Sequence, residues 1–244
     1  MNVPLRTLAP LLRKFDEYRP LPAEVRHAIQ SWPFRLQEYA AGDLIAREGE
    51  EPKESAVLLD GFCFRQKLLV EGSRQILALH VPGDFIDLHS LVLKPLDHSI
   101  LAARPTLVAK IGHSDLFQSL DAYPQLSHYF MWDMALDGAI TRQWMTTMGQ
   151  RSSYEQLAHL ICELFFRLRR VRLVKGNAFD MVLTQAEIGD ICGISMVHVN
   201  RSLRALERDG LIERGRRRIV LPDLEALVQT AGFDPAYLHL LAPD

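Results

Sequence analysis

The segment from Thr184 to Arg218 constrains the fold more than any other part of the chain. Thr184 followed three residues later by Glu187 forms a capping box, which predicts the start of a helix. Gly193 can adopt the positive φ of a sharp turn, and Ser195 can cap a second helix. The segment therefore predicts two helices joined by a tight turn, which is a helix-turn-helix.

The second predicted helix begins at Met196 and separates an apolar face from a polar one. Val199, Leu203 and Leu206 recur at helical spacing and are expected to be buried. A helix with Arg and Asn near its N-terminus is typical of helices that enter the major groove of DNA. The basic hairpin at 213–221 predicts a wing. The expected DNA contacts are Thr184, Gln185, Ser195, Met196, Val197, His198, Asn200, Arg201, Arg204, Arg216 and Arg217.

The distribution of charge favours double-stranded DNA as a partner. The whole chain has a net charge of -2. Counting Lys and Arg against Asp and Glu, residues 151–222 carry +5, whereas residues 1–150 carry -3 and residues 223–244 carry -4. The excess of positive charge lies where phosphate contacts are needed, and an acidic tail follows it. An ordinary helical hairpin with a solvated basic face is the competing interpretation.

Composition places limits on the class of protein. The chain has 244 residues, 48% of them hydrophobic, which is enough for two domains. No segment is long and apolar enough to span a bilayer, and the N-terminus lacks a secretory signal, so we expect a cytoplasmic protein without a membrane partner. Cys63, Cys162 and Cys192 are widely spaced, which predicts small buried residues and no thiolate metal site.

The arrangement of predicted helices and strands along the chain predicts an α+β fold. Helices are expected within residues 5–31, broken by Pro20 and Pro22, and at 124–149 and 154–170. We predict an N-terminal domain at 1–123, a dimerisation helix and hinge at 124–150, and a winged helix-turn-helix domain with an acidic C-terminal tail at 151–244. Between Phe34 and Ile111, short runs separated by turns predict an antiparallel β-roll with strands at Asp43–Ala46, Ala56–Leu59, Phe62–Val70, Gln75–Val81, Ile100–Ala103 and Thr106–Ile111.

The helix predicted between Pro124 and Gly149 carries more apolar bulk than one face covers. It packs either on its own β-roll alone or also on a twin helix from a second subunit. A homodimer is favoured because DNA readers of this kind usually bind two half-sites one helical turn apart. The expected dimer interface is Phe130, Met134, Ile140, Trp144 and Met148.

The order of these parts resembles the Crp/Fnr family of bacterial transcription regulators. The runs that carry the resemblance are AAGDLIAREGE, LDGF, ILALHVPGDFIDLHSL and TQAEIGDICGISMVHVNRSLRALERDGLI. The resemblance implies that the domain at 1–123 is a sensor domain with a cyclic-nucleotide-binding-like β-roll, followed by a long dimerisation helix and a C-terminal winged helix-turn-helix, with RNA polymerase as a partner. It also implies an effector pocket that includes Gly83, Asp84, Phe85, Leu88, His89, His98 and Ser99.

Within this resemblance, four positions of the second helix read bases: Met196, Val197, Asn200 and Arg201. Arg201 matches the family's Arg and can contact guanine O6 and N7. Val197 replaces the family's common Glu, so it cannot accept a hydrogen bond from cytosine but can touch a thymine methyl group. The core of the operator should therefore differ from that of relatives with Glu.

Two positions depart from the family's cyclic-AMP binders. Leu88 stands where those proteins place a ribose-binding Glu, and His98 stands where they place a phosphate-binding Arg. Leu cannot accept a hydrogen bond, and neutral imidazole cannot form the bidentate fork of a guanidinium. None of the first sixty residues is Cys, which argues against the iron-sulfur type of the family. No cofactor is predicted, and the effector is an unknown small molecule other than cyclic AMP, or none.

Three histidines, His80, His89 and His98, lie in or beside the implied pocket. They are either ordinary hydrogen-bonded histidines or ligands of a haem or metal ion. The alternative functions are a ligand-independent regulator whose β-roll is a scaffold, a haem- or metal-dependent sensor, and a signalling subunit that does not bind DNA. The chain has no P-loop and no GxSxG elbow, so we do not expect an enzyme.

Overall fold

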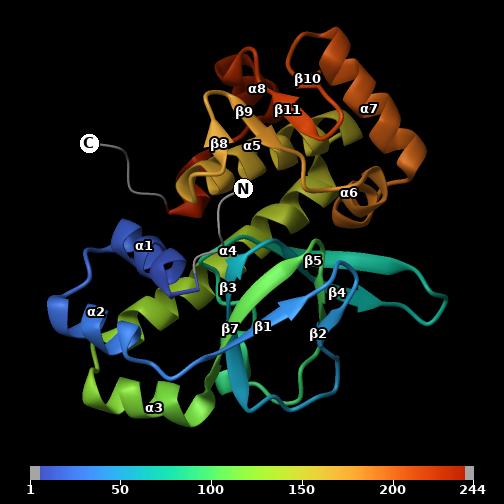
Figure 1. Cartoon of the computed structure of the whole chain (residues 1–244). Helices are drawn as coiled ribbons and strands as arrows, with labels where there is room; N and C mark the ends of the chain where they lie inside the picture. The colour runs from blue at the N-terminus through green and yellow to red at the C-terminus, as the bar shows by residue number, and fades with distance from the viewer. Residues whose placement is uncertain (1–5, 240–244) are drawn as a thin grey trace. The chain divides into compact units, whose positions relative to one another are not determined.

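The computed structural model describes residues 6–239 and shows an α+β chain, as predicted (Figure 1). The chain divides into two compact units. The N-terminal unit takes the chain up to residue 138 except for 69–76, and the C-terminal unit takes residues 69–76 and 139–238. Helix α4, Leu126–Gln150, runs through the boundary between them. The last residues of the predicted acidic tail, 240–244, lie outside the described part of the chain.

The N-terminal unit contains two antiparallel sheets, which confirms the predicted β-roll. Side chains from both sheets and from the turn at Ile86 form one buried cluster that includes Ile45, Leu58, Ile100 and Val108. One sheet has the order β1 (Arg35–Tyr39), β7 (Thr106–Gly112), β3 (Glu54–Asp60); the other has the order β2 (Leu44–Ala46), β6 (Ser99–Ala102), β4 (Cys63–Leu68), β5 (Arg74–His80).

Two elements of this unit were not predicted. Strand β1 reads Arg-Leu-Gln-Glu-Tyr and is only half-buried, because it is an edge strand that pairs with β7 alone. Helix α3, His113–Ala122, buries His113 and Leu116 and has no continuous apolar stripe. Both elements are held by tertiary contacts that local hydrophobic periodicity does not reveal.

Helices α1 (Ala9–Tyr18) and α2 (Ala23–Gln30) precede the sheets, and the break predicted at the two prolines is confirmed. Lys14 of α1 is buried and its Nζ lies 2.7 Å from Asp84 Oδ1, with Asp133 of α4 as its second carboxylate partner. Burial of two carboxylates around one ammonium is tolerated because each charge has a close partner of opposite sign.

The C-terminal unit packs four helices with a small antiparallel sheet of order β10-β11-β9-β8. Strands β8 and β9 were not predicted, because they are only two and three residues long. The helices are α5 (Ser153–Arg170), α6 (Gln185–Cys192), α7 (Met196–Arg208) and α8 (Leu224–Ala231), and the strands are β8 (Val174–Lys175), β9 (Ala178–Asp180), β10 (Glu213–Arg214) and β11 (Arg218–Val220).

A buried carboxylate organises the core of this unit. Glu163 of α5 is 1% exposed and accepts hydrogen bonds from Trp144 Nε1 at 2.9 Å and from the Tyr237 hydroxyl at 2.8 Å. Arg167, one turn further along α5, pairs with it at 3.2 Å. These bonds connect α4, α5 and the 3-10 turn at Pro235–Leu238.

The predicted burial of the three cysteines is confirmed. Burial raises the pKa of Cys162 and of Cys192 to about 12, so neither thiol is a ready nucleophile. Among the described residues, no helix is both long enough and apolar enough to cross a membrane.

Candidate nucleic-acid interface

The predicted helix-turn-helix is present as α6 and α7. Thr184 Oγ1 accepts from the Glu187 N–H at 3.2 Å, and Glu187 Oε2 accepts from the Thr184 N–H, so the capping box is complete. Gly193 ends α6 with φ 66°, the left-handed conformation predicted for the turn. Ser195 then caps α7 and also pairs with His198 Nδ1 at 2.8 Å.

A close approach of two helices fixes the angle at which α7 is presented. A Cβ atom at Gly189 of α6 would lie 2.7 Å from the carbonyl oxygen of Ile194, so only glycine fits there. Val199, Leu203 and Leu206 are buried, as the helical spacing predicted. With its apolar stripe buried, α7 turns its polar side chains outward.

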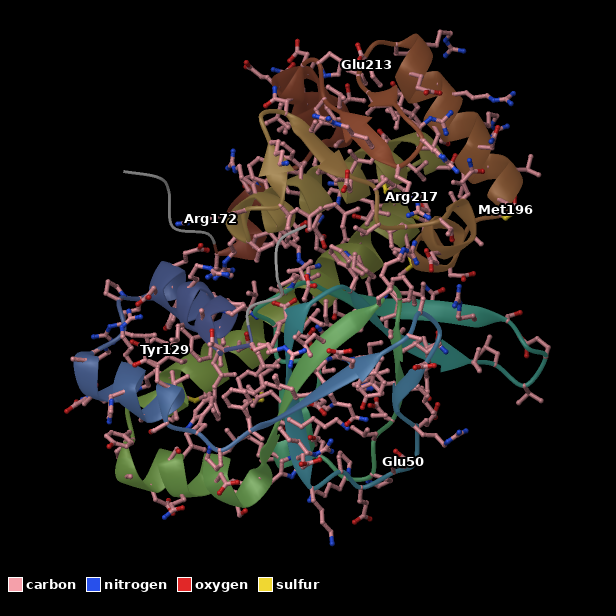
Figure 2. The ribbon with its side chains drawn as sticks, in the orientation of Figure 1. Glu50, Tyr129, Arg172, Met196, Glu213 and Arg217 are labelled. Carbon is pink, nitrogen blue, oxygen red and sulfur yellow. The ribbon has the colours of Figure 1, made fainter. Side chains whose placement is uncertain are left out.

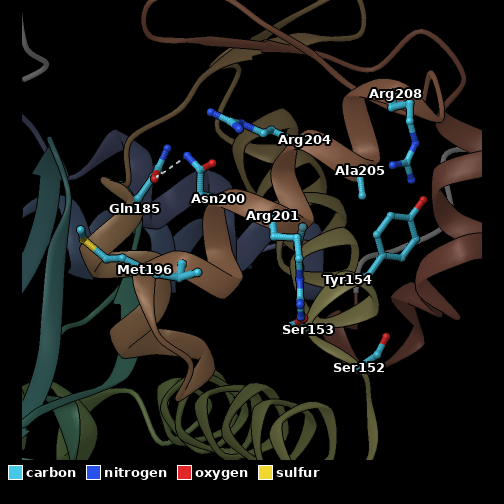
Figure 3. Close-up of a pocket in the computed structure, with 12 residues that line it drawn as sticks. Ser152, Ser153, Tyr154, Gln185, Met196, Asn200, Arg201, Arg204, Ala205 and Arg208 are labelled. Carbon is cyan, nitrogen blue, oxygen red and sulfur yellow. Dashed lines mark hydrogen bonds between the residues drawn. The ribbon is translucent and has the colours of Figure 1, made fainter.

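An open groove of about 930 Å³ follows the exposed face of α7 (Figure 3). Its walls come from α7, from Gln185 of α6 and from the start of α5. The groove brings together six of the predicted DNA contacts and adds six further residues. The predicted ones are Gln185, Met196, Val197, Asn200, Arg201 and Arg204, and the further ones are Ser152, Ser153, Tyr154, Ser202, Ala205 and Arg208.

The guanidinium groups of Arg201, Arg204 and Arg208 repeat along α7 at intervals of three and four residues, and all three residues are exposed. Arg208 Nε lies 3.2 Å from Asp209. Within residues 6–239, no carboxylate pairs with Arg201 or Arg204. The exposed guanidinium groups of Arg201 and Arg204, which form no ion pair with the described residues, give this face of α7 a positive charge that attracts phosphate.

The N-terminal half of α7 also presents uncharged groups. Val197 is 76% exposed. Met196, labelled in Figure 2, is 56% exposed, so the start of α7 presents two apolar side chains to solvent. Asn200 Nδ2 donates to Gln185 Oε1 at 3.3 Å, the bond drawn in Figure 3. This bond connects the two helices and orients an amide toward the groove.

The predicted wing is the hairpin of β10 and β11. Glu213 pairs with Val220 and Arg214 with Ile219, and the Gly215 N–H donates to the Arg218 carbonyl at 2.8 Å. Arg216 and Arg217 therefore occupy the tip of the turn, and both are exposed. Arg214 is different, because it pairs with Glu207 and lowers the pKa of that carboxyl despite some desolvation.

The contribution of α5 to the groove was missed. Ser152, Ser153 and Tyr154 line it, and Ser152 forms a complete capping box with Glu155. The Tyr154 hydroxyl donates to Asp209 at 2.9 Å. The Ser-x-x-Glu pattern at 152–155 was visible in the sequence and marks the helix start, although it does not indicate which surface the helix faces.

Two residues of the implied effector pocket lie side by side: the ring centroids of His89 and His98 are 4.9 Å apart. Phe85 packs against Phe130 at 5.5 Å, and Leu88 is 3% exposed. Other side chains of this region form hydrogen bonds with the backbone. The Val81 N–H donates to Asp84 at 2.9 Å. In the same way, Ser99 Oγ accepts from the Glu48 N–H at 3.0 Å, and Gly83 takes φ 97° in the turn.

The predicted dimer residues of α4 fall into two groups. Phe130 and Trp144 are buried within the single chain, so they are already covered. Met134 is exposed, and Ile140 and Met148 are half-buried. The apolar content of α4 could not distinguish the buried residues from the exposed ones, because a helix that packs only on its own unit is also rich in large apolar side chains.

Two family models match the chain. The model described as a cyclic nucleotide-binding domain matches residues 36–123, and the Crp-like helix-turn-helix domain matches residues 155–230. Together they cover the β-roll from residue 36 onward and the segment that holds α6, α7 and the wing.

Curated relatives are similar over most of the chain. The transcriptional activator protein FnrL of Cereibacter sphaeroides is 25% identical over 81% of this chain and 81% of its own. A probable transcriptional activator of Rhizobium leguminosarum bv. viciae is 28% identical over 83% of this chain and 81% of its own.

Among solved structures, FixK2 from Bradyrhizobium japonicum superposes with a TM-score of 0.71 at 24% identity, covering 81% of this chain and 97% of that one. The structure of a CooA mutant from Carboxydothermus hydrogenoformans gives a TM-score of 0.67 at 17% identity, covering 91% of this chain and 95% of that one. At these identities the structures support the fold.

Proposed function

The chain belongs to the Crp/Fnr family of DNA-binding transcription regulators, and we propose that it binds a two-fold symmetric operator as a homodimer through α7 and the wing. The observation that carries the proposal is the groove along α7, where unpaired guanidinium groups lie beside exposed Met196 and Val197. The proposed organisation is a sensor domain at 1–123, a dimerisation helix and hinge at 124–150, and a DNA-binding domain at 151–244.

The spacing of residues on α4 supports the dimer. Met131, Met134 and Met145 are 55%, 37% and 64% exposed. Together with Gly138, Thr141 and Met148 they repeat at intervals of three and four residues, which is the a and d pattern of a coiled coil. We propose that this stripe, and not Phe130, Ile140 or Trp144, faces the second subunit. Gly138 would allow close approach, and the methionines would fill the seam.

Each exposed group of α7 has a distinct proposed role. Arg201 makes the bidentate contact to guanine, and Val197 touches a thymine methyl group. Asn200 is held by Gln185 and reads adenine. Arg204 and the wing residues Arg216 and Arg217 contact phosphates. Thr184, Ser195 and His198 lie at the N-termini of α6 and α7, where phosphate is favoured.

We propose that the effector is not cyclic AMP. Leu88 is buried and offers no acceptor for a ribose hydroxyl, and burial, followed by the charge of Arg65, lowers the pKa of His98. A neutral His98 cannot replace an arginine at a phosphate. Each lost charge-assisted interaction costs about 1.5–3 kcal/mol, so two together reduce affinity by roughly a hundredfold or more. Such a regulator acts on the chromosome in the cytoplasm together with RNA polymerase.

Isothermal titration of the full chain with cyclic AMP and cyclic GMP tests the effector proposal. We expect no binding at micromolar concentration and no change in DNA affinity. Micromolar binding that also raises affinity for the operator would contradict it, and would mean that backbone amides near Gly83 and the Ser99 hydroxyl are sufficient to hold the phosphate.

Selection from a library of random duplexes tests the DNA-binding proposal. The full chain should enrich inverted half-sites whose centres lie about 10 base pairs apart. A matched selection with Arg201→Ala should lose preference at one base pair of each half-site. Enrichment of a single, unrepeated site would argue against two-fold symmetry.

A further inference from the structure

A cluster of two histidines and one aspartate lies in the N-terminal unit, apart from the DNA-reading groove. His89 belongs to the 3-10 turn Leu88–Leu91, and Asp97 and His98 directly precede β6. One ligand atom of each residue lies within 4.8 Å of the others. His98 is 3% exposed, His89 is half-buried, and the Asp97 side chain is 84% exposed.

The hydrogen bonds of the cluster leave two nitrogen atoms without a partner. His98 Nδ1 lies 2.7 Å from Asp97 Oδ1, and a carboxylate only accepts, so Nδ1 carries the proton. The lone pair of His98 is therefore on Nε2. Nε2 of His98 and Nε2 of His89 are both buried and make no hydrogen bond. Buried polar atoms are nearly always satisfied, so two such atoms in neighbouring rings require an explanation.

The surroundings of the two rings favour their neutral form, because His98 is buried and His89 is half-buried, and burial disfavours a charged imidazole. Neutral imidazole is the form that binds metal ions. The positive charge of Arg65 also acts on both rings, and Arg65 is itself paired, since its Nη1 lies 2.6 Å from Asp137 Oδ2. The carboxylate of Asp97 is then the remaining charge of the cluster, and it is negative.

We propose that His89 and His98 bind a divalent transition-metal ion of the Zn²⁺ class through their Nε2 atoms. Asp97 holds the ring of His98 from its other nitrogen, which is the carboxylate–histidine–metal arrangement that fixes a ligand's orientation. Imidazole nitrogens select ions such as Zn²⁺, Fe²⁺ or Cu²⁺ over Mg²⁺ and Ca²⁺. Two protein ligands leave coordination positions open for water or an external ligand.

Isothermal titration of EDTA-treated full-length protein with Zn²⁺, and visible absorption with Co²⁺, test the site. The expected result is one ion per chain, with affinity reduced at least tenfold in His89→Gln and in His98→Gln. Asp97→Asn should weaken binding about 10–100-fold, because the amide can still accept from His98 Nδ1 but lacks the negative charge that makes His98 a stronger ligand. His27→Gln and His128→Gln replace exposed histidines and are matched controls that should bind as the wild type does.

Equal binding by the wild type and by all three cluster variants would overturn the proposal, as would the absence of stoichiometric binding by the folded wild type. Circular dichroism checks the fold of each variant. If a histidine variant is unfolded, two other measurements test the proposal. One is binding by the exposed Asp97→Asn variant, and the other is the nitrogen coordination of the wild-type Co²⁺ complex, measured by X-ray absorption. DNA selection without metal is a separate readout, so metal binding can fail while the proposed function stands.

Discussion

At the scale of single residues, the chemistry of α7 depends on which side chains remain unpaired. Arg201 has no acidic partner in the described part of the chain, whereas Arg214 is neutralised by Glu207 and Arg208 lies beside Asp209. The sequence shows all of them as Arg. Only the structure distinguishes the guanidinium groups that can contact DNA from those already bound within the unit.

Arg201→Ala should relax selection at one base pair of each half-site by about 1–3 kcal/mol, because a bidentate contact to guanine is lost. Competition binding against single-base variants of the operator measures this change. Arg47→Ala, which removes an exposed arginine of the other unit, is the control and should have no effect. An equal loss on specific and random DNA would show that Arg201 contacts phosphate instead.

Asp87 should make the stability of the N-terminal unit depend on pH. Burial raises its pKa to about 7, although the bond that it accepts from the Ala56 N–H at 2.7 Å opposes the shift. The folded state therefore holds this proton more tightly than the unfolded state. The resulting stabilisation is fully present below about pH 4 and is lost as the pH rises through about 7.

Asp87→Asn removes this titration and keeps an oxygen that can accept from Ala56. Between about pH 4 and 8 the free energy of unfolding of the wild type should fall, relative to the variant, by a few kcal/mol. Denaturant titrations at several pH values measure the difference. Parallel curves for the two proteins would show that Asp87 does not carry the predicted shift.

At the scale of elements, those with strong local signals were predicted and those held by tertiary contacts were not. The capping box at Thr184 and the glycine turn at Gly193 determine α6 and its end. Strand β1 and helix α3 have no such signal, since most of their residues are exposed or only partly buried. Likewise, the heptad stripe of α4 was present in the sequence, but the burial of Phe130 and Trp144 was needed to distinguish it from the inner face.

The wing should contribute affinity without sequence preference. Arg216 and Arg217 lie at the tip of the β10–β11 turn, where they can reach phosphates. Replacing both with Ala should weaken binding to all duplexes and reduce the slope of log K against log salt by about 2. Arg172→Ala with Arg47→Ala is a charge-matched control. An unchanged salt slope would indicate that the wing does not touch the DNA backbone.

At the scale of the whole molecule, the account requires two chains, because each chain offers one α7 and one wing. Met131→Glu with Met145→Glu places charges in the proposed seam of α4 and should convert a dimer into a monomer. Phe117→Glu changes a residue that is exposed on α3 and is the control. Light scattering measures the mass, and a variant that stays dimeric would place the interface elsewhere.

The most direct test of the central claim is the number of chains bound to the selected operator, measured by light scattering of the complex with a full site and with an isolated half-site. Two chains should bind the full site, and binding to the half-site should be much weaker. A single chain that binds one half-site with the affinity of the full operator would contradict it.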